Sequence, residues 1–267
     1  MRRFFNFAAC AIALCCLTAA FNAADFGIAN PAFAADEQKD KPVFDAIAAS
    51  QADDEKYEWT NLFDGKSLEN WIDNGDAGDD VVEIKDGDLV LGMGPTTTSI
   101  HFDEDNSKIK LPRKNYEIEY VSRRVSGTDF FSALTFPIGE NYVTFVNGGW
   151  GGCVAGISSI DDMDASENSS SSFYNFKTGQ WYRFRVQVTL RTVRVWVNDE
   201  KIIDYVVEGH SLKTRFEVSR CQPLGFASWV SDGRIKVVRM RALSDEEIKE
   251  MDERAEEASK FITPDNY

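Results

Sequence analysis

The sequence predicts an all-β protein, built as a two-sheet antiparallel jelly-roll sandwich with a short C-terminal helix. Short runs in which apolar and polar residues alternate follow one another between turn residues, which is typical of half-buried strands. Apolar residues almost never recur with the period of a helix before the last 25 or so residues, so helices are not expected there. The clearest run, WYRFRVQVTLRTVRVWVNDEKIIDYVV at residues 181–207, predicts three consecutive antiparallel strands. Many short strands joined by turns indicate a sandwich.

Within residues 181–207, valines and a phenylalanine alternate with arginines, a glutamine and a tryptophan. The apolar set is expected to face the core, so the polar set forms an outer face of the sheet. Planar hydrogen-bond donors beside an indole ring suit a flat polar ligand such as a sugar. An ordinary solvated face is the alternative interpretation. The residues predicted to form a binding floor here are Arg185, Arg194 and Trp196.

The N-terminus has the features of a targeting segment. Arg2 and Arg3 precede a mostly apolar run at residues 4–21, and Ala32-Phe33-Ala34 is a small-x-small cleavage motif. Residues 1–34 are therefore predicted to be a signal peptide, with an uncleaved anchor helix as the alternative. The sequence thus predicts an exported protein, periplasmic or extracellular, with no stable membrane span after cleavage.

The rest of the chain divides by composition into three parts. Residues 35–56 are small, polar and charged, and we expect a flexible leader there. Residues 57–243 carry the strand patterns and form the predicted jelly-roll domain. Residues 244–267 begin with the capping box Ser244-Asp245-Glu246-Glu247, which predicts a helix followed by a tail.

Charge and cysteine content limit the classes of function. The formal net charge is −15 and the sequence pI is about 4.6, and the sequence contains no basic block to neutralise phosphates, which argues against a nucleic-acid partner. A hydrophobic content of 43% suffices for a large core. Cys153 and Cys221, which lie outside the signal segment, either pair or are each small buried hydrophobes. The sequence does not indicate an oligomeric state.

A glycine-rich and acidic segment, residues 147–168, is the second informative stretch. Four glycines flank Trp150, which lets backbone and ring approach a ligand closely. Asp161, Asp164 and Glu167 follow, and we expect this loop to close one end of a groove and supply a base or hydroxyl partners. A hydrated acidic turn is the alternative interpretation.

No cofactor is predicted, although calcium is one hypothesis for this loop. The spacing Asp162-x-Asp164-x-Ser166 suits Ca²⁺, but Glu167 occupies the position at which an EF-hand loop has glycine. The histidines, at positions 101 and 210, are isolated from each other and do not make a zinc site by themselves. No Gly-x-Ser-x-Gly motif of an acyl-transfer enzyme occurs.

Several motifs together resemble one known family, that of the 3-keto-disaccharide hydrolase domains. NLFDGKSLENW at residues 61–71 and the hairpin EIKDGDLVLG at residues 83–92 are similar to the family's opening. The similarity continues through Gly179-Gln180-Trp181-Tyr182, the strand Val195-Trp196-Val197-Asn198, and Val238-x-Met240-x-x-Leu243. It covers most of residues 57–243.

The resemblance implies a concanavalin A-like jelly roll with a groove on its concave face and a carbohydrate ligand. It also implies cleavage of 3-keto-glycosides or related sugars. A ketone at C3 acidifies the proton at C2, so such a site requires a base and a group that stabilises an enolate. A non-catalytic, lectin-like module that binds glycans with the same face is the main alternative, and a purely structural envelope protein is the third.

The resemblance also suggests site positions. Typical members carry a Glu-x-Gln pair on an inward strand, whereas the matching stretches here, residues 131–134 and 142–147, lack that pair. If the protein is an enzyme, Asp164 or Glu167 is the expected base and an arginine the enolate stabiliser. The predicted substrate-binding residues are Ser132, Tyr142, Thr144, Asn147, Trp150, Asp161, Arg185, Arg194 and Trp196.

Overall fold

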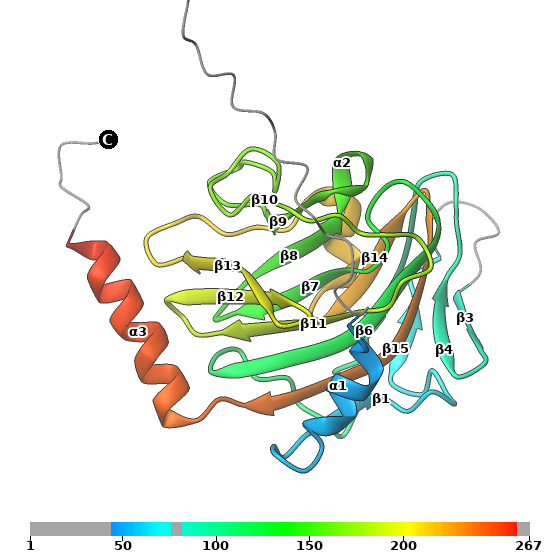
Figure 1. Ribbon diagram of the computed structural model, residues 1–267, viewed down its shortest axis with the longest axis horizontal. Coiled ribbons are helices and arrows are strands. Elements are labelled where there is room, and N and C mark those ends of the chain that lie inside the picture. Colours follow the sequence, from blue (N-terminus) through cyan, green and yellow to red (C-terminus); the bar gives the residue numbers. More distant parts are fainter. Residues whose placement is uncertain (1–43, 76–81, 261–267) are drawn as a thin grey trace, which may run out of the picture. The chain divides into compact units, whose positions relative to one another are not determined.

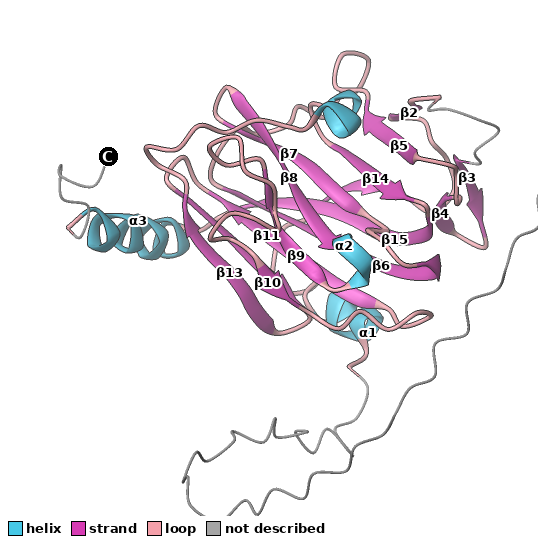
Figure 2. Ribbon diagram, turned by 90° about the horizontal axis from the view of Figure 1, so that it is seen from above, coloured by secondary structure: helices cyan, strands magenta, loops and turns pink. Residues whose placement is uncertain are grey.

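The computed structural model describes residues 44–75 and 82–260 (Figure 1). The predicted signal peptide and the first part of the predicted leader lie outside the described residues. The described part consists of two antiparallel sheets packed face to face, together with short helices (Figures 1 and 2). The predicted all-β sandwich with a C-terminal helix is therefore confirmed.

We call the two layers sheet A and sheet B. Sheet A has the order β13-β12-β11-β6-β15-β4-β3, with β1 also paired to β15, and sheet B has the order β10-β9-β8-β7-β14-β5-β2. The strands of sheet A are β1 (Thr60–Phe63), β3 (Val82–Lys85), β4 (Asp88–Leu91), β6 (Tyr116–Gly127), β11 (Tyr182–Val188), β12 (Thr192–Val197), β13 (Glu200–Val206) and β15 (Ser231–Ala242). Those of sheet B are β2 (Trp71–Asp73), β5 (Thr97–Phe102), β7 (Ala133–Ile138), β8 (Asn141–Gly148), β9 (Val154–Ser158), β10 (Ser172–Phe173) and β14 (Gly225–Trp229). The helices are α1 (Ala46–Ala52), α2 (Gly149–Gly152), the 3₁₀ helix η1 (Phe216–Cys221) and α3 (Asp245–Ser259).

The core lies between the two sheets and is rich in aromatic rings. The predicted strands of residues 181–207 are β11, β12 and β13, and their apolar side chains face this core as expected. Phe184 of β11 pairs in register with Val197 of β12, and both are fully buried. Phe184 also stacks on Tyr120 of β6, with ring centroids 4.7 Å apart. Alternation along a strand therefore gave the correct inner face for β11 and β12.

The outer face of sheet A carries a layer of buried ion pairs. Glu119 of β6 is fully buried and accepts hydrogen bonds from Nε of Arg183 at 2.8 Å and from Nε of Arg239 at 3.0 Å. Two further carboxylates, from the segment after α1, complete the layer: Asp53 pairs with Arg183 and Asp54 with Arg239. Charged groups buried at this depth need such partners, because an unpaired buried charge is costly.

Helix α1 lies within the part of the chain predicted to be a flexible leader, so that prediction is wrong for residues 46–52. Asp45 caps the helix by accepting hydrogen bonds from the backbone N–H groups of Ile47 and Ala48. Ser50 then donates from Oγ to Oε1 of Glu119 at 2.5 Å. Polar composition suggested disorder, but these polar side chains have specific partners on sheet A.

Helix α3 begins at the predicted capping box. The Ser244 hydroxyl accepts from the backbone N–H of Glu247, and the Glu247 carboxylate accepts from the backbone N–H of Ser244. Further along, Glu250 pairs with Arg194 at 2.9 Å, and the hydroxyl of Thr192 donates to the carbonyl of Met251 at 3.0 Å. The helix thus covers part of the outer face of sheet A.

Replacing the cap of α3 should have a small, measurable effect on stability. Ser244→Ala removes the oxygen that satisfies the N–H of Glu247, and we expect the free energy of unfolding to fall by about 1 kcal/mol. Urea denaturation of both proteins measures the difference. Ser244→Asp keeps an acceptor and should stay within a few tenths of a kcal/mol of the parent; an equal loss in both variants would contradict this role of the cap.

Within residues 44–75 and 82–260, no helix combines the length and the apolar character needed to cross a membrane.

Candidate functional site

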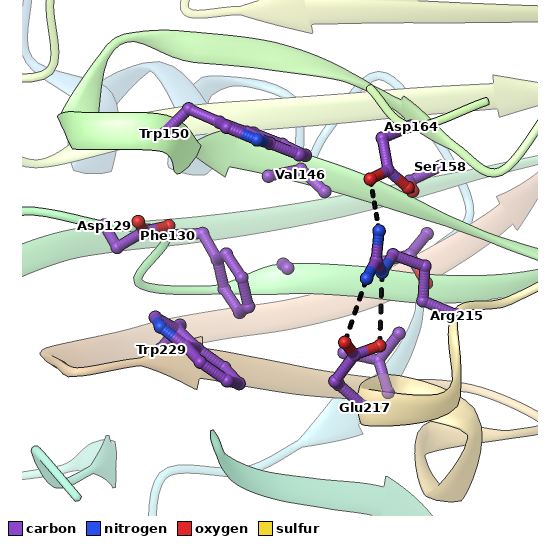
Figure 3. Close-up of a pocket in the computed structure, with 12 residues that line it drawn as sticks. Asp129, Phe130, Val146, Trp150, Ser158, Asp164, Arg215, Glu217 and Trp229 are labelled. Carbon is purple, nitrogen blue, oxygen red and sulfur yellow. Dashed lines mark hydrogen bonds and ion pairs between the residues drawn. The ribbon is translucent and has the colours of Figure 1, made fainter. Parts of the chain in front are cut away.

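The outer face of sheet B contains a pocket of about 320 Å³ (Figure 3). Its floor is made of small and medium side chains from neighbouring strands, namely Ala133 of β7, Thr144 and Val146 of β8, and Ser158 of β9. These side chains point away from the core because they alternate with inward residues such as Leu134 and Phe145. Because these strand residues are small, they leave space for the pocket, and larger side chains form its walls.

One wall of the pocket is aromatic. Phe130, Trp150 and Trp229 lie together on this side (Figure 3), and the rings of Phe130 and Trp229 have centroids 6.4 Å apart. Trp150 is 45% exposed and belongs to α2, where its φ is +49°. A tryptophan in the left-handed region is strained, and such strain is concentrated at functional sites. The glycines around Trp150 allow the tight turn that presents its ring.

The other wall is charged and consists of Asp164, Arg215 and Glu217 (Figure 3). Arg215 donates from Nη1 to Asp164, and from Nε and Nη2 to both carboxylate oxygens of Glu217, at 3.1 and 3.0 Å. These hydrogen bonds lower the pKa of the Glu217 carboxyl group and raise that of the Arg215 guanidinium. Three of the five N–H donors of Arg215 are thus engaged, and two have no partner among the described residues.

A short ladder between two loops brings this charged wall together. Ser159 and Lys213 exchange two backbone hydrogen bonds of 2.7 and 3.2 Å, and the backbone N–H of Asp161 donates to the carbonyl of Ser211 at 2.9 Å. The ladder places the segment that ends at Asp164 beside the segment that leads into Arg215. Residues about 50 positions apart in the sequence are therefore held in contact by backbone pairing, which is a rigid form of support.

A third carboxylate, Asp129, lies on the aromatic side of the pocket (Figure 3). Burial raises the pKa of its carboxyl group above the ordinary value, and backbone N–H groups of Phe130, Gly151 and Trp150 oppose that shift. The N–H of Phe130 donates to Oδ1 at 2.8 Å. Asp129 therefore ties the turn at Trp150 to the strand face and also places an acidic group in the pocket.

Three of the predicted site residues line this pocket: Thr144, Trp150 and Asp164. Two others face the opposite way, and their prediction as groove residues is corrected. Ser132 and Asn147 are fully buried between the sheets, where Nδ2 of Asn147 donates to Oγ of Ser132 at 2.8 Å and to the hydroxyl of Tyr120 at 3.1 Å. They satisfy one another's polar groups inside the core, as buried polar side chains must.

Three more of the predicted residues lie outside the pocket. Tyr142 lies on the same face of β8 as Thr144 but lines a different hollow. Asp161 pairs with Nδ1 of His210 at 2.6 Å. Glu167 is exposed and accepts a hydrogen bond from the backbone N–H of Asp164 at 3.3 Å, so it caps the turn instead of lining the pocket. Of the two predicted bases, the structure places only Asp164 in the pocket.

The predicted floor formed by Arg185, Arg194 and Trp196 is wrong in its position. These residues lie on the outer face of sheet A, whereas the pocket lies on the outer face of sheet B. Arg185 stacks on Trp196 at 5.0 Å and pairs with Glu117 at 2.8 Å, and Arg194 lies under α3. A sandwich has two outer faces, and strand alternation does not tell which of them is open.

The sequence-based prediction missed five charged or aromatic residues that line the pocket. They are Asp129, Phe130, Arg215, Glu217 and Trp229. Trp229 could have been found, because it shares the strand face of Ala227, opposite to the buried Phe226. Nothing in the sequence pairs Arg215 with Asp164, since that contact arises from loop packing.

The acidic loop does not gather its carboxylates around one point. Asp162 pairs with Lys213 at 2.8 Å, and Asp164 pairs with Arg215. Within the part of the chain that the structure describes, no group of three or more histidine, cysteine, aspartate or glutamate side chains is arranged to hold a metal ion. Calcium binding by this loop stays a hypothesis. Cys153 is exposed and Cys221 is buried, and they are not linked to each other.

Comparison with solved structures gives distant matches. A Parabacteroides distasonis protein assigned to the glycosyl hydrolases is 16% identical, with 74% of this chain and 97% of that chain covered and a TM-score of 0.43. The transglycosylase Crh5 is 12% identical, with 70% and 84% covered and a TM-score of 0.48. The carbohydrate-binding module CBM66 of Bacillus subtilis is 12% identical, with 65% and 96% covered and a TM-score of 0.38.

Comparison with curated proteins gives no match. The sequence profile of one family, described as the 3-keto-alpha-glucoside-1,2-lyase-like domain, matches residues 58–241. The matched region is more than half of the chain and contains the strands of both sheets, the pocket floor and the loops that carry Asp164 and Arg215. The chain therefore belongs to the family of 3-keto-alpha-glucoside-1,2-lyase-like domains.

Proposed function

We propose that this protein cleaves 3-keto-glycosides by elimination in the pocket on sheet B. The observation that carries the proposal is the pairing of an aromatic wall with a wall of Asp164, Arg215 and Glu217 across one hollow. Aromatic faces suit the apolar face of a sugar ring, and the charged wall supplies a base and a cation. The features of residues 1–34 support export as part of the same proposal.

In the proposed first step, a carboxylate oxygen of Asp164 takes the proton from C2 of the sugar. The electrons of the C2–H bond move into the C2–C3 bond, and the C3 carbonyl becomes an enolate. In the second step the enolate reforms the C3 carbonyl, a C1–C2 double bond forms, and the bond from C1 to the aglycone oxygen breaks. The products are an unsaturated keto sugar and the released alcohol.

Arg215 is suited to stabilising the enolate because negative charge moves only a short way in this step. Before it, the charge lies on Asp164, which Arg215 contacts. After it, Asp164 is neutral and the charge lies on the enolate oxygen, to which the two unpartnered N–H groups of Arg215 are available. Glu217 acts as a positioning residue, since its two oxygens hold Nε and Nη2 of the guanidinium.

Asp129 is the proposed proton donor to the leaving oxygen. It lies on the opposite side of the pocket from Asp164 (Figure 3). Its carboxyl group has a raised pKa caused by burial, which favours the protonated form needed in an acid. Two carboxylates whose environments differ in this way are typical of an acid and base pair.

The aromatic wall predicts a specific effect on affinity. Trp229→Ala should raise KM about tenfold with kcat nearly unchanged, because stacking of a ring on a sugar is worth about 1 kcal/mol beyond the buried area. Initial rates over a range of 3-keto-glycoside concentrations measure this. Trp196→Ala, on the outer face of sheet A, is the matched control and should leave KM unchanged; a similar rise in both variants would contradict the assignment.

The function is tested by incubating the full chain with 3-ketotrehalose and following two signals. Elimination should release glucose and give a product whose conjugated double bond and ketone absorb in the ultraviolet. A hydrolase that adds water at C1 would release glucose without lasting absorbance. Absence of glucose release at any protein concentration would overturn the proposal.

Glycan binding without cleavage is the second candidate, and one observation favours it. Asp164 and Glu217 are both already ion-paired with Arg215, an arrangement that also suits a static site for hydroxyl groups. This alternative predicts that 3-ketotrehalose and trehalose bind with similar affinity and that neither is changed. Calorimetry with both sugars, followed by chromatography of the recovered ligand, separates the two functions.

A further inference from the structure

Most exposed tryptophan rings of this chain are covered by a cationic side chain. The chain has six tryptophans, and Trp71 is buried in the core. Three of the others have a guanidinium group over the ring, at 4.2, 4.4 and 5.0 Å from the ring centroid; the pairs are Arg239 with Trp59, Arg123 with Trp181, and Arg185 with Trp196. Such pairs form because the face of an aromatic ring attracts positive charge.

The aromatic wall of the pocket lacks such a cation. Trp150 and Trp229 are the two remaining tryptophans, and they form this wall together with Phe130 (Figure 3). Among the described residues, no lysine or arginine lies over any of these three rings. All three are at least half-buried or exposed at the pocket, so their faces are available to a ligand.

The carboxylate beside these rings also has no cationic partner. Within residues 44–75 and 82–260, no lysine, arginine or histidine forms an ion pair with Asp129. The buried Arg124 contacts the backbone of Asp129 instead, because its Nη1 donates to the carbonyl of Asp129 at 3.4 Å and its Nη2 to that of Phe176 at 2.6 Å. The aromatic side of the pocket thus combines three rings and a carboxylate with no positive side chain between them.

The opposite wall does not supply the missing positive charge. Asp164 and Glu217 are two carboxylates around the single guanidinium of Arg215. With Asp129 ionised, the pocket therefore holds three carboxylates and one guanidinium, and its charge is negative. A cleft with an excess of one sign of charge concentrates ligands of the opposite sign. This pocket is expected to attract cations and to disfavour phosphates and carboxylates.

The lining favours an organic cation over a metal ion. A metal ion needs several oxygen or nitrogen ligands around one point, and the described part of the chain has no group of three or more such side chains arranged to hold one. Aromatic faces instead suit an alkylammonium group. The rings of Phe130 and Trp229 are inclined at 42°, and Trp150 adds a third ring. Rings in different orientations suit a rounded group better than a single flat one.

We propose that the aromatic wall, together with Asp129, binds a quaternary or methylated ammonium group. Binding of this group does not depend on the proposed elimination. Because the ammonium group and the sugar both contact Trp229, they exclude each other, and alkylammonium compounds should inhibit cleavage; this second consequence rests on the proposed function. A bound cation also favours the ionised form of Asp129 over the protonated form that the elimination uses.

The test compares choline with 3,3-dimethylbutan-1-ol, a neutral analogue of almost the same shape in which carbon replaces the nitrogen. In calorimetry with the full chain at constant ionic strength, choline should bind about tenfold more tightly, because ring faces and a carboxylate attract only the charged ligand. Equal affinities would mean that the pocket is apolar without selecting for charge, and would overturn the proposal. Failure of both ligands to bind would overturn it as well.

Two variants locate the site. Trp229→Leu keeps an apolar side chain but removes a ring face, so choline binding should weaken about fivefold while binding of the neutral analogue changes less. Trp196→Leu is the matched control, since Arg185 already covers that ring, and it should change neither affinity. Asp129→Asn, with folding checked by circular dichroism, should weaken choline binding by a similar factor. Equal losses in Trp229→Leu and Trp196→Leu would show that the aromatic wall is not the site.

Kinetics separates failure of this site from failure of the proposed function. If both proposals hold, choline raises KM for 3-ketotrehalose and leaves kcat unchanged. If choline binds through Trp229 but no 3-keto-glycoside is cleaved, the ammonium site stands and the proposed elimination falls. If 3-ketotrehalose is cleaved but choline neither binds nor raises KM, the proposed elimination stands and the ammonium site falls.

Discussion

Asp164→Asn should lower kcat for 3-ketotrehalose by 10²- to 10⁴-fold, about the range that a general base contributes. The amide keeps an oxygen that accepts from Arg215 but has no basic lone pair for the proton at C2. Affinity for the sugar should change little, since the pocket keeps its shape. Stopped-flow or steady-state release of glucose measures kcat, and calorimetry with trehalose measures the affinity.

Asp162→Asn is the matched control for this variant. Asp162 lies on the same loop, pairs with Lys213 at 2.8 Å and does not line the pocket. Its replacement should leave kcat within about twofold of the parent, as expected for a surface change. If both variants lose activity equally, activity depends on the ordered structure of the loop and Asp164 is not the base. If neither loses activity, the proton at C2 is taken by another group.

Glu119→Ala should destabilise the fold by about 3–5 kcal/mol, because it leaves buried guanidinium groups without their carboxylate. Glu119 is fully buried and bonded to Arg183, Arg239 and Ser50, which come from β11, β15 and α1. Arg183 and Arg239 are themselves almost fully buried, so water does not replace the lost partner. Chemical denaturation followed by tryptophan fluorescence measures the free energy of unfolding.

Glu83→Ala on β3 provides the comparison, since this glutamate is exposed and carries no comparable network. It should change the free energy of unfolding by less than about 0.5 kcal/mol. The loss in the free energy of unfolding for Glu119→Gln should lie between those of Glu83→Ala and Glu119→Ala, because glutamine keeps an acceptor but loses the charge. A loss below about 1 kcal/mol for Glu119→Ala would mean that solvent reaches the network, against the burial described above.

Strand patterns and the capping box predicted the fold well, because both depend on local periodicity. Phe184 and Val197 face the core as their alternation requires, and α3 begins at Ser244. The leader was mispredicted because the polar side chains of α1 and the residues after it find partners far away, at Glu119, Arg183 and Arg239. The composition of a segment indicates whether it is soluble, but not which distant residues it contacts in the folded protein.

The site was predicted only in part, for two physical reasons. Periodicity defines an outer face for each sheet, but the choice between them depends on what covers them, and α1 and α3 cover the face of Arg185 and Arg194. The charged wall depends on pairing between residues 159–164 and 210–215, which no local pattern encodes. Asp164 was found because an acidic loop beside Trp150 is visible in sequence, whereas Arg215 was not.

The location of both α1 and α3 on sheet A has a practical consequence for attaching the protein to a solid support. A linker at Glu257, an exposed residue of α3, would hold the molecule by the side away from the pocket on sheet B. Coupling through the thiol of Cys153, which is exposed and lies directly after the turn that presents Trp150, would instead set the resin beside the pocket. Sensor surfaces and immobilised reactors made from this protein should therefore be coupled through the C-terminal helix.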